Sequence, residues 1–280
     1  MKRKARRIAI ILGLGASVAY FGMVGLVWWI QDSLVFAPTR GYTQLPETHG
    51  LEHEDVILEV APGISVKGWF VRARGTPRAT ILYFHGSGGN LSSYMSFISQ
   101  SAESGFDSFA IDYEGYGDSD GTPSEAAIYR DADAAWQWLT KTRGVDPKRV
   151  AIWGFSLGSG VATYCAERYD PGALVLQSGF TTIPDVGARI YFWLPIHRIA
   201  KTWFNNLERM PNIHVPLLIA HGREDLLIPF TMGEQLYAAA NMPKKFVELN
   251  GGHNDGLDET PRLWSDVTEL LQQAGVLVPL

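Results

Sequence analysis

The stretch Val150-Ala-Ile-Trp-Gly-Phe-Ser156-Leu-Gly-Ser-Gly160 decides how this chain folds. Its first four residues have strand character, and a segment compatible with a helix runs from Gly160 to Arg168. A Gly-x-Ser-x-Gly sequence at such a strand-to-helix turn is typical of a nucleophile elbow. Glycine is needed two positions before and after the serine, because a side chain there would collide with the neighbouring strand and helix. The hydroxyl then lies at a helix N-terminus, which favours negative charge. The alternative interpretation is a glycine-rich turn with a serine helix cap.

Apolar runs on both sides of the elbow predict the other strands. An alternating pair, Glu54–Val60 and Ser65–Val71, is joined by a turn at Pro62-Gly63 and predicts two paired strands. The remaining expected strands are Ala79–Phe84, Asp107–Ile111, Ala173–Gln177, Leu217–His221 and Lys245–Leu249. Because helical segments alternate with these runs, we expect an α/β fold with a mostly parallel central sheet and helices on both faces.

Two helix starts can be placed from local signals. The sequence Thr122-Pro-Ser-Glu125 is typical of a capping box with proline at the first helical position. The last helix is expected to begin at Thr260-Pro261, and its apolar residues recur on one face.

Composition limits the class of protein. The 280 residues are 46% hydrophobic and 19% charged, which is typical of a globular chain with a sizeable core. The single cysteine, Cys165, excludes an internal disulfide and a cysteine-based zinc site, and we expect it to be buried. The formal net charge of the whole chain is −5, but five of its 24 basic residues lie before residue 8 and no acid lies among the first 30 residues. Residues 31–280 therefore carry a formal net charge of −10. A body this acidic is a poor partner for nucleic acid or anionic lipid.

The N-terminus has the pattern of a membrane anchor. Ile8 to Ile30 is a charge-free run of 23 residues, long enough to cross a bilayer of about 30 Å. Trp28 and Trp29 end the run, and the basic cluster before it predicts a cytoplasmic N-terminus with the catalytic domain on the other side. A cleaved signal peptide ending near Ser17-Val-Ala19 is the alternative. We therefore expect an anchor at 1–30, a connector at 31–50 and a catalytic domain at 51–280.

A serine nucleophile needs a base, and the base needs an acid to orient it. His253 is the candidate base, because it lies in a glycine-rich loop between the last strand and the last helix. Asp225 is the candidate acid, since its loop follows the strand Leu217–His221 at the end where open sheets keep their sites. Glu224 and Asp185 are the alternative acids. The remaining histidines include His85 and His221, which we expect to shape loops.

An oxyanion intermediate needs two N–H donors. The backbone of Leu157 is one candidate, and Ser87, with Gly88 as the alternative, is the other. The glycines after His85 could also form a phosphate cradle, but no Gly-Lys-Ser/Thr sequence supports this. Asp118 and Asp120 stand in a turn and are expected to be solvated. We expect no cofactor and no metal.

Five motifs together resemble the α/β-hydrolase superfamily, and most closely its small membrane-anchored α/β-hydrolase domain-containing proteins, which include depalmitoylase-like members. They are His85-Gly86, Gly115-Tyr-Gly117, Gly154-Phe-Ser-Leu-Gly158, Gly222-Arg-Glu-Asp225 and Gly252-His-Asn-Asp255. The order Ser156, Asp225, His253 is the order of this superfamily. The resemblance covers residues 35 to 275 and implies a cofactor-free serine hydrolase of carboxylic esters or thioesters. Relatives often have asparagine directly after His-Gly, whereas this chain has Ser87 there. The difference falls on the residue that is the candidate for the second oxyanion donor.

The expected substrate is a small or lipid-like acyl ester. A serine peptidase with the same triad and a non-catalytic binding module on this fold are the alternatives. About forty residues separate Gln177 from Leu217, too few for a large helical lid, so we expect a minimal cap. The aromatic segment 190–204 within this stretch is either an acyl-binding wall beside the membrane or a helix packed on the sheet.

Overall fold

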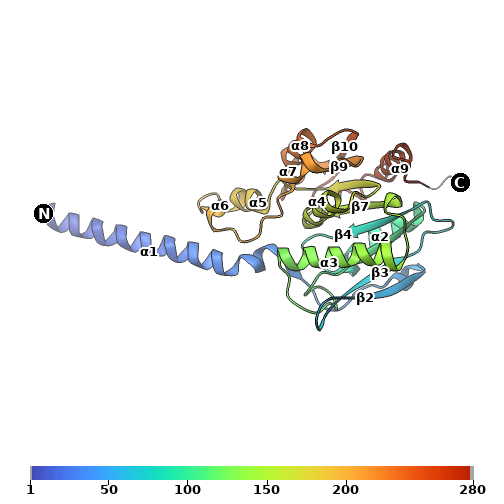
Figure 1. Cartoon of the computed structure of the whole chain (residues 1–280). Helices are drawn as coiled ribbons and strands as arrows, with labels where there is room; N and C mark the ends of the chain where they lie inside the picture. Colours follow the sequence, from blue (N-terminus) through green and yellow to red (C-terminus); the bar gives the residue numbers. More distant parts are fainter. Residues whose placement is uncertain (1, 278–280) are drawn as a thin grey trace.

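A computed structural model of the chain describes residues 2–277, and its centre is an eight-stranded sheet (Figure 1). The strand order is β10 (Lys244–Leu249), β9 (Leu217–Gly222), β8 (Ala173–Gln177), β7 (Val150–Phe155), β4 (Ala79–Phe84), β6 (Phe106–Ile111), β3 (Ile64–Val71) and β2 (His53–Ala61). The first six strands of this order are parallel, whereas β3 and β2 are antiparallel to their neighbours. The α/β-hydrolase fold expected from the sequence is confirmed.

Helices cover both faces of the sheet, because alternate strand residues point to opposite sides. On one face α2 (Met95–Glu103) and α9 (Leu263–Gln273) pack in one hydrophobic cluster. On the other face lie α3 (Glu125–Gln137), α4 (Leu157–Tyr169) and α8 (Phe230–Ala239), which belong to the second cluster. Cys165 on α4 is fully buried in this cluster, as expected, and burial raises the pKa of its thiol.

Shorter elements connect these layers. The segment between β8 and β9 contains α5 (Ile183–Ile190), α6 (Ile196–Ile199), α7 (Asn206–Arg209) and η5 (Met210–Asn212). The other short elements are β1 (Ala37–Pro38), η1 (Pro46–His49), β5 (Gly88–Gly89), η2 (Leu91–Tyr94), η3 (Trp138–Thr142) and η4 (Pro147–Arg149). The cap over the sheet is therefore limited to short helices.

Two expected helix starts were wrong by two or three residues. The cap of α3 is Ser124, whose hydroxyl accepts the Ala127 N–H at 3.1 Å, and not Thr122. Glu125 does not reach back over this turn, because its carboxylate accepts the backbone N–H groups of Trp203 and Phe204 at 2.7 and 2.8 Å. The last helix begins at Leu263 instead of Thr260. A tertiary contact of α3 thus replaced the local capping box.

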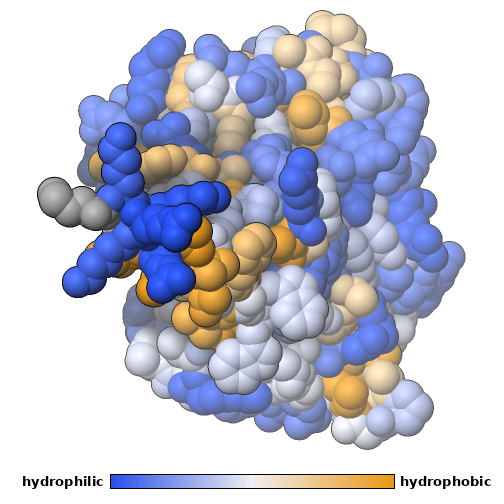
Figure 2. All heavy atoms as spheres, turned by 90° about the vertical axis from the view of Figure 1, so that its left-hand side faces the viewer, coloured by the Kyte–Doolittle hydropathy of each residue, from blue (hydrophilic) through white to orange (hydrophobic). Residues whose placement is uncertain are grey.

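The N-terminal helix α1 (Lys2–Val35) projects from the domain as one long rod (Figure 1). It is long and apolar enough to cross a membrane. Seen along α1 from its N-terminal end, a hydrophilic group stands in front of hydrophobic side chains (Figure 2), as the five basic residues before residue 8 predict. The helix continues five residues beyond the charge-free run, and Phe36 directly after it is buried. The chain then pairs β1 with β5, which brings residues 37–38 beside the loop that follows β4.

Candidate active site

Ser156 lies at the turn between β7 and α4 with φ 51° and ψ −118°. This conformation is uncommon for a residue with a side chain and stores backbone strain. The side chain is nearly buried, and its Oγ is 2.9 Å from His253 Nε2. The sequence Gly154-Phe-Ser-Leu-Gly158 therefore forms a strand-to-helix turn that directs the serine hydroxyl at a histidine.

The two glycines of this turn permit a very close approach of backbones. A Cβ at Gly158 would lie 1.9 Å from the Phe84 carbonyl oxygen of β4. A Cβ at Gly154 would lie 2.3 Å from the Gly158 carbonyl oxygen and 2.6 Å from Ala162 Cβ. The strand and the helix that a side chain at position 154 or 158 would strike are therefore β4 and α4.

His253 links the serine to Asp225. Its Nδ1 is 2.7 Å from Asp225 Oδ2, so the imidazole lies between the carboxylate and the hydroxyl. The centroids of the Phe155 and His253 rings lie 5.3 Å apart, so Phe155 helps to hold the plane of the imidazole. The structure thus brings together the three residues that the sequence separated by 69 and 28 positions.

The environment of Asp225 keeps it ionised. Burial opposes the charge, but hydrogen bonds from His221 and His253 outweigh it and hold the pKa of the carboxyl well below its ordinary value. The other oxygen, Oδ1, accepts the backbone N–H groups of Leu227 and Ile228 at 3.0 and 2.8 Å. A carboxylate fixed in this way can orient the histidine and stabilise an imidazolium ion.

His221 is fully buried at the end of β9 and supports the Asp225 loop. Its Nε2 lies 2.9 Å from the Ile228 carbonyl oxygen and 3.5 Å from Asp225 Oδ2. The expectation that His221 shapes a loop is consistent with these contacts. The loop concerned is the one that carries the acid, a connection that the sequence did not reveal. The strand-end histidine four residues before the acid was the available signal.

The alternative acids lie elsewhere. Glu224 is exposed beside Asp225. Asp185 on α5 is bonded to Thr181 and His197 at 2.6 and 2.9 Å. Burial disfavours its charge, yet these hydrogen bonds lower the pKa of its carboxyl. Neither residue is bonded to His253, so Asp225 is the acid that the geometry supports.

Leu157 and Ser87, the candidate oxyanion donors, both border the space beside Ser156. Leu157 is the first residue of α4, and the first N–H groups of a helix have no partner within it. The peptide before Ser87 is fixed by the His85 ring, whose Nδ1 lies 2.8 Å from the Gly86 carbonyl oxygen. Because N–H and C=O point in opposite directions across a trans peptide, the Ser87 N–H is directed away from the buried His85. The loop histidine therefore orients this candidate donor.

The Ser87 carbonyl is held independently. It accepts the Ala37 N–H of β1 at 2.9 Å and the Tyr116 hydroxyl at 2.8 Å. The glycine-rich loop after β4 is consequently fastened to the chain that leaves α1 and to the loop after β6.

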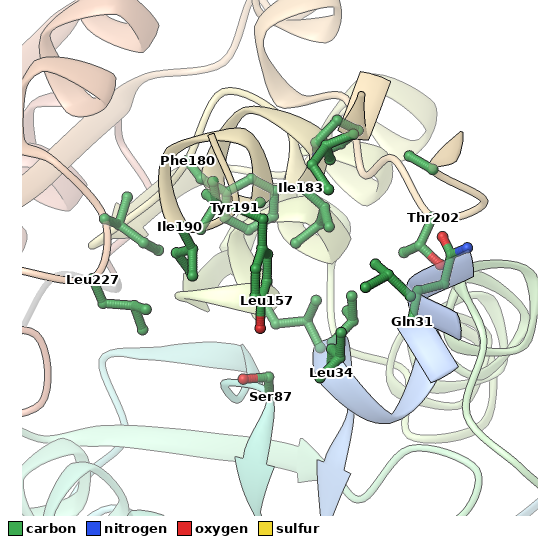
Figure 3. A pocket seen from close by; sticks show the side chains of 18 of the residues that line it. Gln31, Leu34, Ser87, Leu157, Phe180, Ile183, Ile190, Tyr191, Thr202 and Leu227 are labelled. Carbon is green, nitrogen blue, oxygen red and sulfur yellow. The ribbon is translucent and has the colours of Figure 1, made fainter. Parts of the chain in front are cut away.

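Two cavities meet at Ser156. The first, of about 200 Å³, is almost entirely apolar, and Figure 3 shows Leu34, Leu157 and Ile183 directed into it. The second, of about 490 Å³, is more polar and contains Tyr94, Asn254 and Asp258 as well as His253. Ser87 and Leu227 border both. The serine hydroxyl thus stands between an apolar cavity and a more polar one, called the polar cavity below.

Nothing in the described chain forms a metal centre: among residues 2–277 no group of three His, Cys, Asp or Glu side chains could hold an ion. Asp120 instead accepts the Ser65 N–H at 3.0 Å.

Comparisons with known proteins agree with this architecture. Residues 79–198 match the family described as the alpha/beta hydrolase fold. The protein Rv2307c of Mycobacterium tuberculosis is 35% identical over 257 residues, covering 91% of each chain. Alpha/beta hydrolase domain-containing protein 17B of Xenopus tropicalis is 35% identical over 204 residues, 72% of this chain and 69% of the relative. The chain belongs to the α/β-hydrolase superfamily.

Solved structures show the same fold. The Pyrococcus furiosus esterase Pf2001 superposes with a TM-score of 0.70 at 22% identity, over 85% of this chain and 97% of the esterase. This likeness shows the fold, and the family match together with the alpha/beta hydrolase domain-containing relatives supports a hydrolase.

Proposed function

We propose that this protein is a serine hydrolase that cleaves carboxylic esters or thioesters through an acyl-enzyme on Ser156. The observation that carries the proposal is the continuous chain of hydrogen bonds from Asp225 through His253 to Ser156, at 2.7 and 2.9 Å. The chain ends at a nearly buried hydroxyl beside an apolar cavity that suits an acyl group.

The reaction follows from this geometry. As Ser156 Oγ attacks the carbonyl carbon, His253 Nε2 takes its proton, and Asp225 stabilises the resulting imidazolium. The carbonyl oxygen becomes an oxyanion, for which the backbone N–H groups of Leu157 and Ser87 are the proposed donors. His253 then gives the proton to the leaving oxygen or sulfur. Water attacks the acyl-enzyme with the same histidine as base, and the acid is released.

The two cavities have different roles in this scheme. The leaving group must lie where His253 can protonate it, and His253 borders only the polar cavity. The acyl group then extends into the apolar cavity, past Leu157. Within the described residues, no lysine or arginine borders the polar cavity, and Asp258 lies in it. We therefore expect an uncharged polar alcohol or thiol, and not a phosphate, as leaving group.

We further propose that Ile8 to Ile30 anchors the enzyme in a membrane, with a cytoplasmic N-terminus and the catalytic domain on the other side. The apolar length of α1 supports the anchor. The five basic residues before the run support the orientation.

A fluorophosphonate probe tests the nucleophile. The full-length protein in detergent should be labelled, and Ser156→Ala should abolish labelling. Ser104→Ala, in a serine at the end of α2, is the matched control and should be labelled like the wild type. Labelling that persists in Ser156→Ala would refute the assignment, and a folded wild type without labelling would favour a binding module.

A substrate panel tests the bond that is cleaved. Acyl esters and thioesters of graded chain length should be hydrolysed faster than aminoacyl amides, because the apolar cavity offers an acyl chain a dry site but offers a peptide backbone few partners. Faster cleavage of the amides would make the protein a peptidase.

A further inference from the structure

The C-terminal part of α1 is bonded to the segment that contains α5 and α6. The Gln31 amide donates to the Ile199 carbonyl at 3.2 Å and accepts the Lys201 N–H at 2.7 Å. Eleven residues earlier, the Tyr20 hydroxyl donates to the Trp193 carbonyl at 3.2 Å. Eleven helical residues span about 17 Å, so the two segments run side by side over several turns. In Figure 1, α5 and α6 project from the domain on the same side as α1.

One face of α1 is also a wall of the apolar cavity. Val27, Gln31, Leu34 and Val35 border the cavity together with Ser156. Their spacing of four, three and one residues places them on a single face of a helix. Figure 3 shows Leu34 directed from α1 into the space that Leu157 and Ile183 also border, with Gln31 beside Thr202 at its edge. The helix therefore contributes directly to the site where we place the acyl group.

This wall is continuous with the part of α1 that would lie in a bilayer. Val27 belongs to the charge-free run, and Lys201 Nζ lies 4.0 Å from the centroid of the Trp28 ring, a pairing suited to the membrane interface. Beside α1 the α5–α6 segment exposes Phe192 and Trp193, at 80% and 52% of their surfaces. Neighbouring exposed aromatics next to a spanning helix indicate contact with lipid.

We propose that α1 is part of the substrate site and that the acyl chain enters the apolar cavity sideways from the bilayer. The substrate is then a long-chain ester of an uncharged membrane lipid that lies in the same bilayer as α1. This inference rests on the proposed ester hydrolysis and adds the source of the substrate and its route. A helix that served only as a tether would not need to border the cavity.

The route can be tested with two populations of vesicles. Full-length protein is reconstituted into vesicles, and a fluorogenic dioleoylglycerol is placed either in the same vesicles or in a separate population. Two long chains slow the exchange of this lipid through water, because each buried methylene group adds to the cost of leaving the membrane. Hydrolysis should require enzyme and lipid in one vesicle. Equal rates in both arrangements would overturn the lateral route.

The wall can be tested with a matched pair of substitutions. Leu34→Trp fills the cavity from α1, whereas Leu26→Trp changes the same residue type at the same 48% exposure away from it. Leu34→Trp should lower the ratio of dioleoylglycerol to butyryl ester turnover by roughly tenfold, since the added ring displaces methylene groups of the chain. Leu26→Trp should leave the ratio unchanged. Val27→Trp provides a second wall variant if Leu34→Trp does not insert.

The outcomes separate this inference from the proposed function. If the wild type hydrolyses neither the butyryl ester nor the lipid, the proposed function fails. If it hydrolyses the butyryl ester and neither wall variant changes the ratio, only the role of α1 fails. A preference for an S-acylated membrane peptide over the lipid ester in the same vesicles would overturn the assignment to a lipid.

Discussion

Replacing Asp225 by asparagine should leave the fold intact and disable the proposed base. The two backbone N–H groups that Asp225 Oδ1 accepts can still bond to the asparagine oxygen. The amide nitrogen then faces His253 Nδ1, where the carboxylate oxygen stood at 2.7 Å. An N–H donor there favours the tautomer whose Nε2 carries the proton. That Nε2 cannot accept a proton from Ser156 Oγ, which lies 2.9 Å away.

The size of the effect can be worked from the same contacts. An imidazolium and a carboxylate whose charge centres lie about 4 Å apart attract by about 4 kcal/mol at an effective dielectric constant near 20. Loss of this attraction alone slows turnover by about 10³-fold, at about 1.4 kcal/mol per factor of ten. The unfavourable tautomer adds to this loss, so we expect a decrease on the order of 10⁴-fold, the size that the serine-protease template shows for the same change.

The assay is kcat/KM for a water-soluble butyryl ester, measured on full-length protein in detergent, with thermal unfolding as the check of folding. Glu224→Gln is the matched control, because Glu224 is the exposed neighbour and has no contact with His253 among the contacts described. A decrease of less than tenfold in a folded Asp225→Asn, or a crippling effect of Glu224→Gln, would refute the assignment of the acid.

Three further predictions concern other parts of the molecule. The protein should remain in the membrane fraction after a carbonate wash, because α1 is apolar enough to span; a released fragment that begins near Tyr20 would indicate a cleaved signal peptide. Gly158→Ala should destabilise the fold by about 3 kcal/mol in denaturant unfolding, because the added Cβ would collide with β4. The control Gly15→Ala should leave the stability unchanged, since a Cβ there meets nothing within 4 Å. Equal stabilities of the two variants would contradict the close packing. Burial raises the pKa of Asp131 to about 8 in the folded chain, whereas the same carboxyl has a pKa of about 4 in the unfolded chain. Between these two values the folded chain holds a proton that the unfolded chain has released. The free energy of unfolding should therefore fall between about pH 5 and pH 8 in the wild type and fall less in Asp131→Asn; parallel curves would contradict the raised pKa.

Local sequence determined the elements that depend on local chemistry. The strand-to-helix turn around Ser156 was predictable because only glycine tolerates the contacts at 154 and 158, and this requirement is visible in five consecutive letters. The strands were predictable from apolar runs, because a parallel strand is buried on both faces. Asp225 and His253 could be proposed because each follows a strand at the same edge of the sheet.

Contacts between distant segments could not be predicted in this way. The start of α3 shifted because Glu125 bonds to Trp203 and Phe204, which lie 78 and 79 positions away. The support of Asp225 by His221 depends on the path of one loop over the end of β9.

The part played by α1 shows the difference most clearly. The sequence by itself determined that Ile8 to Ile30 is a charge-free helix long enough for a bilayer, because length and hydrophobicity are properties of the segment alone. That this helix continues to Val35 and borders the cavity beside Ser156 was decided only by tertiary structure. Gln31 is bonded to the backbone of Ile199 and Lys201, about 170 positions away in the chain. These contacts form only because the folded sheet places the end of α1 beside the segment that contains α6. Periodicity reports which face of a helix is apolar, but not which surface that face will meet.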